Sequence, residues 1–403
     1  MKNSKRIQLG LEQNIGQFSL LVLINAFVGG MIGIERSIFS EFATTEFAID
    51  STTAILSFIA AFGLAKALAN YYAGRWANQT GRKNLLVIGW LFALPVPWLL
   101  IYAESWAVVV GANLLLGLSQ GLTWSSTVVM KIDLVGPKNR GLAMGLNEFA
   151  GYLAVGLFAI LSNKIAEDFG IRPYPFYLGV IISLLGLVLS FFFVKDTRAF
   201  VLLENQSDGS SAMLSHPFWD TTLRHKKLSS ITYAGLINNL NDGMIWGLLP
   251  LLLLSLKFES ASIGMIVGIY PLVWGIGQLF TGKMGDQFDK SKLIFWGMFI
   301  QGLAIIIMPI TTSVAIFLIV SVALGLGTAL VYPNFLSGIA EIAPIKQRAE
   351  VIGIFRLWRD LGYVFGALLS GVIADYMGLN WAIFMIGLLT FSAAFIIRFR
   401  YNS

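Results

Sequence analysis

Residues 351–374 read VIGIFRLWRDLGYVFGALLSGVIA, an apolar stretch that nevertheless carries Arg356, Arg359 and Asp360. About 20 apolar residues in a helix are enough to cross the hydrocarbon core of a bilayer. Similar stretches recur along the chain, and only 12% of its 403 residues are charged. Soluble proteins carry about twice that share of charged residues. The sequence therefore predicts an all-α polytopic membrane protein.

The apolar stretches predict twelve transmembrane helices. Their expected ranges are 17–39, 52–73, 84–103, 106–130, 141–163, 175–195, 228–256, 262–282, 292–310, 314–340, 351–374 and 380–398. The longest polar segment, 196–227, is rich in Ser, Asp, Gly and Pro, as expected of a linker. We therefore expect a six-helix bundle at 1–195, a linker at 196–227 and a second six-helix bundle at 228–403. The first stretch carries Glu35 and Arg36 and is too long for a signal-peptide core, so we expect it to be retained.

The basic residues predict the orientation of the chain. Of its 28 Lys and Arg residues, 21 fall at the termini and in the loops that share a side with them, and 3 fall in the opposite loops. Positive residues concentrate on the cytoplasmic side of membrane proteins. Both termini are therefore expected in the cytoplasm, and the net charge of +6 requires no nucleic-acid partner. The chain has no cysteine and two histidines, which argues against disulfides and a metal centre; no cofactor is expected.

The two halves of the chain resemble each other at a shift of 208 residues. GRWAN at 74–78 aligns with GKMGD at 282–286, and KNRGLAMG at 138–145 aligns with KQRAEVIG at 346–353. Two similar halves predict two six-helix bundles related by a pseudo-twofold axis along the membrane normal. Secondary transporters use this repeat design, with the substrate site between the halves.

The segment GRWANQTGRK at 74–83 resembles the signature of the major facilitator superfamily, which falls between transmembrane helices 2 and 3. Gly74, Gly81, Arg82 and Lys83 match that signature, whereas Asn78 stands where the family has Asp. The resemblance implies that this loop latches the cytoplasmic side of the outward-facing state. The second copy keeps Gly282 and Asp286, so Asp286 is expected to carry more of the latch. The alternative is that these residues only form a tight turn.

Two departures from family patterns bear on the substrate. The family's Arg-x-x-Gln-Gly pattern in helix 4 here reads GLSQG, with Gly117 in place of the arginine often linked to proton coupling. The glycine- and proline-rich motif of helix 5 in drug/proton antiporters has no proline here, where the chain reads GLNEFAGYLAVG. Both departures argue against a typical proton-driven drug exporter.

Eight charged residues fall within the predicted transmembrane helices. These are Glu35, Arg36, Lys66, Glu148, Asp242, Arg356, Arg359 and Asp360. Each costs about 2.5–3.5 kcal/mol at the bilayer centre, so they should face protein or a wet cavity and should pair. Lys66, Glu148 and Arg359 each lie roughly 10–12 Å from the cytoplasmic ends of their helices and are expected in one layer.

Two interpretations of this layer remain open. In the first, Lys66 pairs with Asp360 and Glu148 pairs with an arginine, and these pairs hold the two halves together. In the second, an excess arginine binds an anionic substrate, because a guanidinium grips carboxylate or phosphate through two parallel hydrogen bonds. The candidate substrate-binding residues are Arg359, Arg356, Lys66, Glu148 and Asp360. The repeat aligns Arg356 with Glu148, whereas Arg359 has no charged counterpart, so Arg359 is the first candidate for the anion.

Asp242 is the first candidate for a proton-coupling residue and Glu35 is the second. Asn238, Asn241 and Asp242 lie at positions that share one helical face. An isolated carboxyl in a partly wet, low-dielectric site can exchange protons near neutral pH. The alternatives are that Asp242 is a hydrogen-bonded packing residue and that Glu35 and Arg36 reach toward the outer membrane surface. Some aromatic residues are expected to line the cavity, from Trp124, Tyr152, Trp246, Tyr270, Trp274, Tyr332 and Trp358.

We therefore predict a secondary active transporter that works by alternating access in the bacterial cytoplasmic membrane. The expected cargo is a small organic solute with an anionic group, coupled to protons, and the protein is expected to be a monomer and not an enzyme. A multidrug or lipophilic-compound efflux antiporter is the alternative within this class. A non-transporting membrane sensor is the alternative from another class, although no appended soluble domain is evident.

Overall fold

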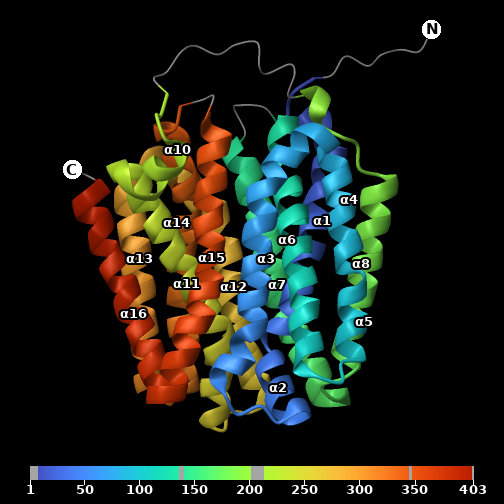
Figure 1. Cartoon of the computed structure of the whole chain (residues 1–403), viewed down its shortest axis with the longest axis vertical. Coiled ribbons are helices and arrows are strands. Elements are labelled where there is room, and N and C mark those ends of the chain that lie inside the picture. Colours follow the sequence, from blue (N-terminus) through green and yellow to red (C-terminus); the bar gives the residue numbers. More distant parts are fainter. Residues whose placement is uncertain (1–7, 136–139, 201–212, 345–346, 402–403) are drawn as a thin grey trace.

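The computed structural model describes residues 8–135, 140–200, 213–344 and 347–401, which form a bundle of long helices (Figure 1). The N-terminal half contains α1 (Ile15–Arg36), α2 (Phe39–Phe47), α3 (Thr52–Thr80), α4 (Arg82–Ala93), α5 (Pro95–Ile101), α6 (Trp106–Val135), α7 (Arg140–Phe169) and α8 (Tyr174–Phe192). The C-terminal half contains α11 (Lys226–Ser255), α12 (Ser260–Gln287), α13 (Lys290–Ile307), α14 (Val314–Ile342), α15 (Arg348–Met377) and α16 (Leu379–Ile396). Short turns complete it: η1 (Glu12–Asn14), α10 (Pro217–Trp219), η3 (Asp220–Arg224), η4 (Met308–Ile310) and η6 (Ile397–Tyr401).

The predicted twelve-helix membrane fold is confirmed. Within the described residues, eleven helical segments are long and apolar enough to cross a membrane. The twelfth is α11, which spans 30 residues and is buried over most of its length. Three asparagines and one aspartate lower its hydropathy, and these polar residues point to a position among other helices rather than against lipid. The first predicted helix ends earlier than expected, at Arg36, and α2 follows as a separate helix.

Proline and glycine set several helix boundaries. Pro95 and Pro97 divide one membrane crossing into α4 and α5, because proline lacks the amide hydrogen that a continuous helix needs. Gly81 (φ 91°) precedes α4 and Gly378 (φ 90°) separates α15 from α16. Both glycines occupy a backbone region that side chains with a Cβ rarely adopt. These turns keep successive crossings antiparallel.

Two helix pairs join the halves of the molecule: α3 packs on α15, and α7 packs on α12. Glycines allow the second pair to approach closely, since a Cβ on Gly156 would lie 2.7 Å from the backbone oxygen of Gly268. We call the end of the bundle that holds α10 and η3 the linker end, and the opposite end the far end (Figure 1).

Hydrogen bonds join the halves at the far end. The Asp375 carboxylate, near the end of α15, accepts from the backbone amides of Thr52 (2.6 Å) and Thr53 (3.1 Å) at the start of α3. Asn163 donates to the backbone oxygen of Ser260 at 2.6 Å, which joins α7 to the start of α12. This conformation is therefore closed at its far end.

We predict that Asp375→Ala will shift the protein toward a conformation open at the far end. The change removes the carboxylate that caps α3 from the other half, and such a cap contributes about 0.5–2 kcal/mol. The population of the far-end-open state should rise roughly 5-fold. Spin-label distances between the far ends of α3 and α15 will measure it. Asp168→Ala is the control, because Asp168 pairs with Lys164 on its own helix. An unchanged distance distribution in Asp375→Ala would contradict this role.

Candidate functional site

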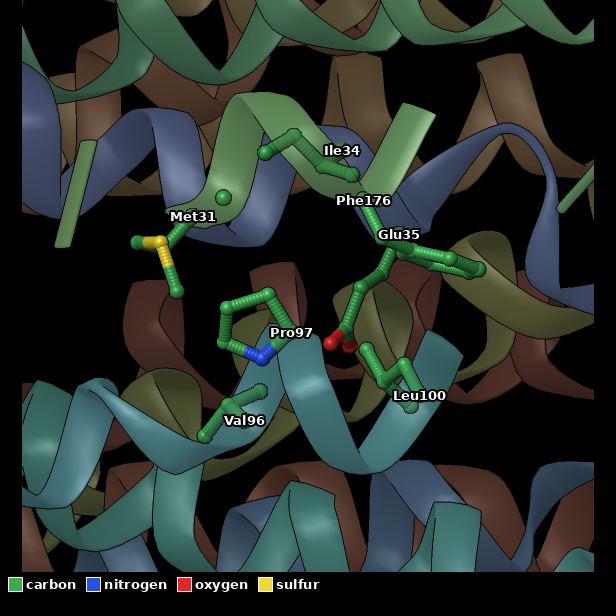
Figure 2. A pocket seen from close by; sticks show the side chains of 8 residues that line it. Met31, Ile34, Glu35, Val96, Pro97, Leu100 and Phe176 are labelled. Carbon is green, nitrogen blue, oxygen red and sulfur yellow. The ribbon is translucent and has the colours of Figure 1, made fainter. Parts of the chain in front are cut away.

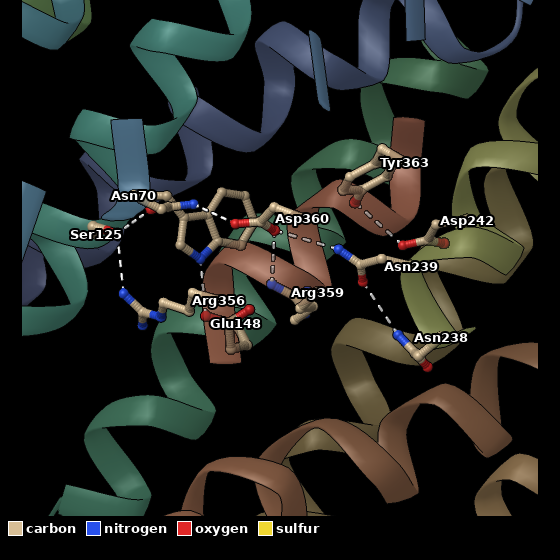
Figure 3. Close-up of polar contacts among 11 residues, drawn as sticks. Asn70, Ser125, Glu148, Asn238, Asn239, Asp242, Arg356, Arg359, Asp360 and Tyr363 are labelled. Atoms are coloured by element: carbon tan, nitrogen blue, oxygen red, sulfur yellow. Dashed lines mark hydrogen bonds and ion pairs between the residues drawn. The ribbon is translucent and has the colours of Figure 1, made fainter. Parts of the chain in front are cut away.

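Charged residues from both halves meet in the middle of the bundle (Figure 3). The N-terminal half contributes Lys66 from α3 and Glu148 from α7, and the C-terminal half contributes Asp242 from α11 and Arg359 and Asp360 from α15. Each of these five residues is buried, with Asp360 fully inaccessible. Arg356 lies one turn before Asp360 on α15 and is half-buried. The structure thus brings together all five candidate substrate-binding residues and the first candidate proton site.

Four residues form a hydrogen-bonded chain between the halves, which we call the polar clamp: Asn70, Ser125, Arg356 and Asp360. Arg356 Nη1 donates to Ser125 Oγ at 3.0 Å, and Ser125 in turn donates to Asn70. Asn70 Nδ2 then donates to Asp360 Oδ2 at 2.6 Å. Arg356 and Asp360 lie four residues apart on one face of α15. The polar clamp therefore binds α15 to α3 and α6 through neutral side chains of the N-terminal half.

The polar clamp takes the place of the ion pairs that the sequence suggested. Among the described residues, Lys66 does not form an ion pair with Asp360, and Glu148 does not form one with an arginine. Asp360 instead lies within ion-pair distance of its neighbour Arg359, at 3.4 Å. The Glu148 carboxylate instead accepts from Trp124 Nε1 and Asn147 Nδ2, both at 2.9 Å. Its second oxygen is buried without a hydrogen-bond partner. In this conformation the first interpretation of the charged layer does not hold.

Aromatic rings surround Lys66. Its Nζ lies 5.4 Å from the ring centre of Phe62, 5.8 Å from that of Trp124 and 5.2 Å from that of Tyr363. A cation near aromatic faces gains about 0.5–2 kcal/mol from each favourable contact. These rings come from α3, α6 and α15, so the ammonium group sits between the halves.

Arg359 presents an unused hydrogen-bonding edge. Its guanidinium carbon lies 4.3 Å from the ring centre of Tyr332, and its Nη1 lies 3.4 Å from Asp360. Its Nε and Nη2 are buried and have no hydrogen-bond partner. These two nitrogens form one side of the guanidinium fork, which is the side that can grip a carboxylate with two parallel bonds. A buried donor pair without acceptors is costly, so this edge is suited to a ligand.

Two tyrosines hold Asp242. Tyr270 of α12 donates to one carboxylate oxygen at 2.5 Å, and Tyr363 of α15 donates to the other at 3.3 Å. Asn241 turns away, accepting from Thr390 and donating to Gln301 at 3.2 Å inside the C-terminal half. The predicted polar face of α11 is therefore divided between two environments. Asp242 faces the charged layer, and Asn238 is joined to that layer through Asn239, which donates to Asp360 at 3.4 Å (Figure 3).

Glu35 lies inside the N-terminal half and away from the charged layer. Figure 2 shows its carboxyl group among side chains of α1, α5 and α8, including Pro97, Leu100 and Phe176. Asn113 is its polar neighbour. Arg36 faces the other half, with its guanidinium carbon 4.9 Å from the ring centre of Trp246. Both Glu35 and Arg36 are buried, so the interpretation that they extend to the membrane surface is wrong.

The described contacts of the latch segment are with α6 and with the first residues of the linker. Arg82 Nε lies 3.4 Å from Asp133, which also accepts from Thr197 at 2.6 Å. The backbone amide of Lys83 donates to Asp196 at 3.2 Å. Burial opposes ionisation of Asp196, but hydrogen bonds from Arg198 and from Lys83 hold the pKa of its carboxyl below the usual value. The surroundings of Gly74 and the side chains of Asn78 and Asp286 lie outside what the structure describes, and Gly282 is half-buried on α12.

Some site residues carried no signal in the sequence. Asn70 and Ser125 are common polar residues in apolar helices, and only their shared contact with α15 distinguishes them. The helix expected at 106–130 ends before Lys131, but α6 continues to Val135 and buries this lysine, with Nζ 3.2 Å from the backbone oxygen of Leu21. Conversely, Trp358 donates to Thr222 of η3 at 3.0 Å and therefore does not line the site.

Comparison with known proteins agrees with this architecture. The family model described as Major Facilitator Superfamily matches residues 18–230 and again 231–402. In fold, the chain is similar to the human organic anion transporter MFSD10 (TETRAN), with a TM-score of 0.70, 16% sequence identity, and coverage of 97% of this chain and 100% of that chain.

Three relatives illustrate the range of similar sequences. The proton-coupled antiporter flippase LtaA of Staphylococcus saprophyticus is 24% identical over 78% of this chain and 76% of its own length. The multidrug resistance protein MdtG of Dickeya zeae is 23% identical over 80% of this chain and 78% of its own length. An uncharacterised transporter of Methanocaldococcus jannaschii is 31% identical over 157 residues, which span 39% of this chain and 41% of that protein. With its repeat, its twelve-helix fold and a family model matched in both halves, this chain belongs to the Major Facilitator Superfamily and is a membrane transporter rather than an enzyme.

Proposed function

We propose that the protein moves a small organic anion across the membrane by alternating access, coupled to protons. The observation that carries this proposal is the buried edge of Arg359, where Nε and Nη2 lack hydrogen-bond partners between the two halves. A carboxylate or phosphate supplies the two acceptors that this edge needs. The second interpretation of the charged layer is therefore the one that we adopt.

The net charge of the interface supports an anionic cargo. The charged side chains near the interface between the halves include Arg36, Lys66, Glu148, Asp242, Arg356, Arg359 and Asp360. Four of these are basic and three are acidic, so the set carries a net charge of +1 when all are ionised. An anion bound at Arg359 would neutralise this excess. A lipophilic cation would add to it at a site where water does not screen the charges.

Binding from both halves gives the anion a means to drive the conformational change. Lys66 belongs to the N-terminal half and Arg359 to the C-terminal half, so an anion between them stabilises the conformations in which both groups can reach it. A ligand shifts a conformational equilibrium only through such differential binding. The polar clamp would then open and close with the cycle, because it joins the same two halves. One carboxylate oxygen of Glu148 is unpaired, so after the anion has been released this carboxylate could take its place beside Arg359.

Asp242 is our proposed proton-coupling residue, and Glu35 remains the second candidate. Tyr270 and Tyr363 donate to the Asp242 carboxylate and join it to α12 and to α15, the helix that carries Arg359. A relative, LtaA, is named a proton-coupled antiporter, which supports coupling to protons in this chain. Glu35 is less well placed, because the residues around it belong to the N-terminal half alone.

The proposal includes the orientation of the chain, its linker and its latch. The linker end faces the cytoplasm with both termini, the segment at 196–227 links the two bundles, and the protein acts as a monomer in a bacterial cytoplasmic membrane. Gly81, Arg82 and Lys83 act with Gly74, Asn78, Gly282 and Asp286 as the cytoplasmic latch. Efflux of lipophilic compounds is the second candidate function, favoured by the many aromatic rings at the interface and by the name of the relative MdtG.

We predict that Arg359→Gln will weaken binding of a simple carboxylate, with benzoate and hexanoate as probes, by about 10- to 100-fold. The change removes the charge and the whole guanidinium fork and leaves a shorter, neutral amide. Isothermal titration on purified protein will measure it. Arg359→Lys should be intermediate, because lysine keeps the charge without the fork. Arg172→Gln is the control, since Arg172 pairs with Glu46 at the far end. Wild-type affinity in a well-folded Arg359→Gln protein would refute the anion site.

Asp242→Asn is predicted to uncouple carboxylate transport from the pH gradient. The amide keeps the shape of the carboxyl group but cannot take up and release a proton. In proteoliposomes, accumulation driven by a pH gradient should be lost, while exchange of labelled for unlabelled substrate should continue. Asp168→Asn, at an exposed acid near the far end, should leave both activities unchanged. Normal pH-driven accumulation by Asp242→Asn would exclude this residue as the coupling site.

A further inference from the structure

A chain of aromatic rings crosses between the halves beside Arg359. Tyr152 of α7 and Trp274 of α12 stack face to face, with ring centres 3.5 Å apart and planes inclined by 25°. Trp124 lies 5.2 Å from Tyr152 on the N-terminal side of this stack. Tyr270 and Tyr332 lie 5.8 Å and 6.4 Å from Trp274 on the C-terminal side. All five rings are buried.

The stack is connected to the anion site on both sides. Tyr332 contacts both the Trp274 ring and the Arg359 guanidinium, the latter at 4.3 Å. Trp124 contacts Tyr152 and donates to Glu148 at 2.9 Å. The indole nitrogen of Trp274 is buried without a hydrogen-bond partner. A ligand held by Arg359 would therefore have the Tyr152 and Trp274 rings within reach of its remaining atoms.

The Tyr152–Trp274 stack joins the N-terminal half to the C-terminal half, and these halves must separate here during alternating access. When the halves part, each ring loses the other and exposes a flat apolar face beside a cationic site. An aliphatic group could cover these faces, but a planar aromatic ring restores the stacked geometry that the two rings have with each other. Offset stacks of aromatic rings are favoured beyond the area that they bury.

We propose that the cargo is a planar aromatic anion, with its ring stacked between Tyr152 and Trp274 and its carboxylate on Nε and Nη2 of Arg359. This inference rests on the proposed anion transport and names the class of anion. It assigns the two rings as specificity-determining residues, whereas Arg359 determines the requirement for charge.

The test compares two anions that share their charge and carbon skeleton and differ in aromaticity and planarity. The probes are 2-naphthoate and decahydro-2-naphthoate, which share charge, ring skeleton and approximate size. Affinities for the purified wild-type protein are measured by isothermal titration. We expect 2-naphthoate to bind roughly 3- to 10-fold more tightly than its saturated counterpart. Equal affinities, or tighter binding of the saturated anion, would overturn the inference.

Variants assign the preference to the stack. Trp274→Leu and Tyr152→Leu should bring the affinity ratio close to one while both anions still bind, because Arg359 is unchanged. Trp274→Phe and Tyr152→Phe should keep most of the preference and serve if either leucine variant fails to fold. Trp296→Leu is the matched control, since the Trp296 ring of α13 is 54% exposed and lies outside the interface contacts described here. If the folded leucine variants keep the wild-type ratio of affinities for the two anions, Tyr152 and Trp274 do not determine the aromatic preference.

The outcomes separate this inference from the proposed function. If both naphthoates bind equally and Arg359→Gln weakens both, the anion site stands and the aromatic preference falls. If neither anion binds and neither is transported by the wild-type protein, the anion site itself falls, and the aromatic inference with it. If 2-naphthoate is preferred and the preference depends on Tyr152 and Trp274, both are supported.

Discussion

The need to satisfy buried charge between the two halves governs this molecule. Arg359, Asp360 and Lys66 lie in the middle of a bundle that crosses a bilayer, where an unsatisfied charge costs about 2.5–3.5 kcal/mol. The polar clamp meets part of this need with an amide and a hydroxyl, Asn70 and Ser125, which hold Asp360 and Arg356. Neutral partners bind more weakly than opposite charges, so the halves are joined without being locked. That balance suits an interface that must open in every cycle.

The scaffold brings the charged layer together by close helix packing. Gly156 and Gly268 let α7 and α12 touch through their backbones, and Gly63 lets α3 approach the Cβ of Tyr363 on α15. At the far end, Asp375 closes the gap by capping a helix of the other half. Within the charged layer, Nε and Nη2 of Arg359 and one carboxylate oxygen of Glu148 remain without a hydrogen-bond partner, and a substrate or a change of partner could satisfy them.

The sequence was informative about positions and uninformative about partners. Hydropathy located the membrane crossings to within several residues, and the 208-residue repeat predicted two halves. Helix depth alone placed Lys66, Glu148 and Arg359 in one layer, and the structure brings them together. However, depth does not determine rotation about the helix axis, so it could not decide between the two interpretations of this layer. The pairing of Lys66 with Asp360, which belongs to the first interpretation, does not form in this conformation. Asn70 and Ser125 could not be identified, because their role exists only where α3, α6 and α15 meet.

Two further residues show where hydropathy misleads. Lys131 looked like a loop residue because its charge lowers the local hydropathy, yet α6 continues past it and buries it. Glu35 looked like a surface residue because it lies near a helix end, yet α5 and α8 enclose it. In both cases a charged residue lowers the local hydropathy and so predicts exposure, whereas the structure shows that neighbouring helices bury it.

The central claim is that the interface binds a negative charge rather than a general apolar solute. It is tested most directly by titrating the wild-type protein with short carboxylates, such as benzoate and hexanoate, and with their uncharged primary amides, which have nearly the same shape. Our account predicts that the carboxylates bind at least about 10-fold more tightly than the amides, since hydrogen bonds to charged groups contribute more than neutral ones. Equal binding of acids and amides would contradict it.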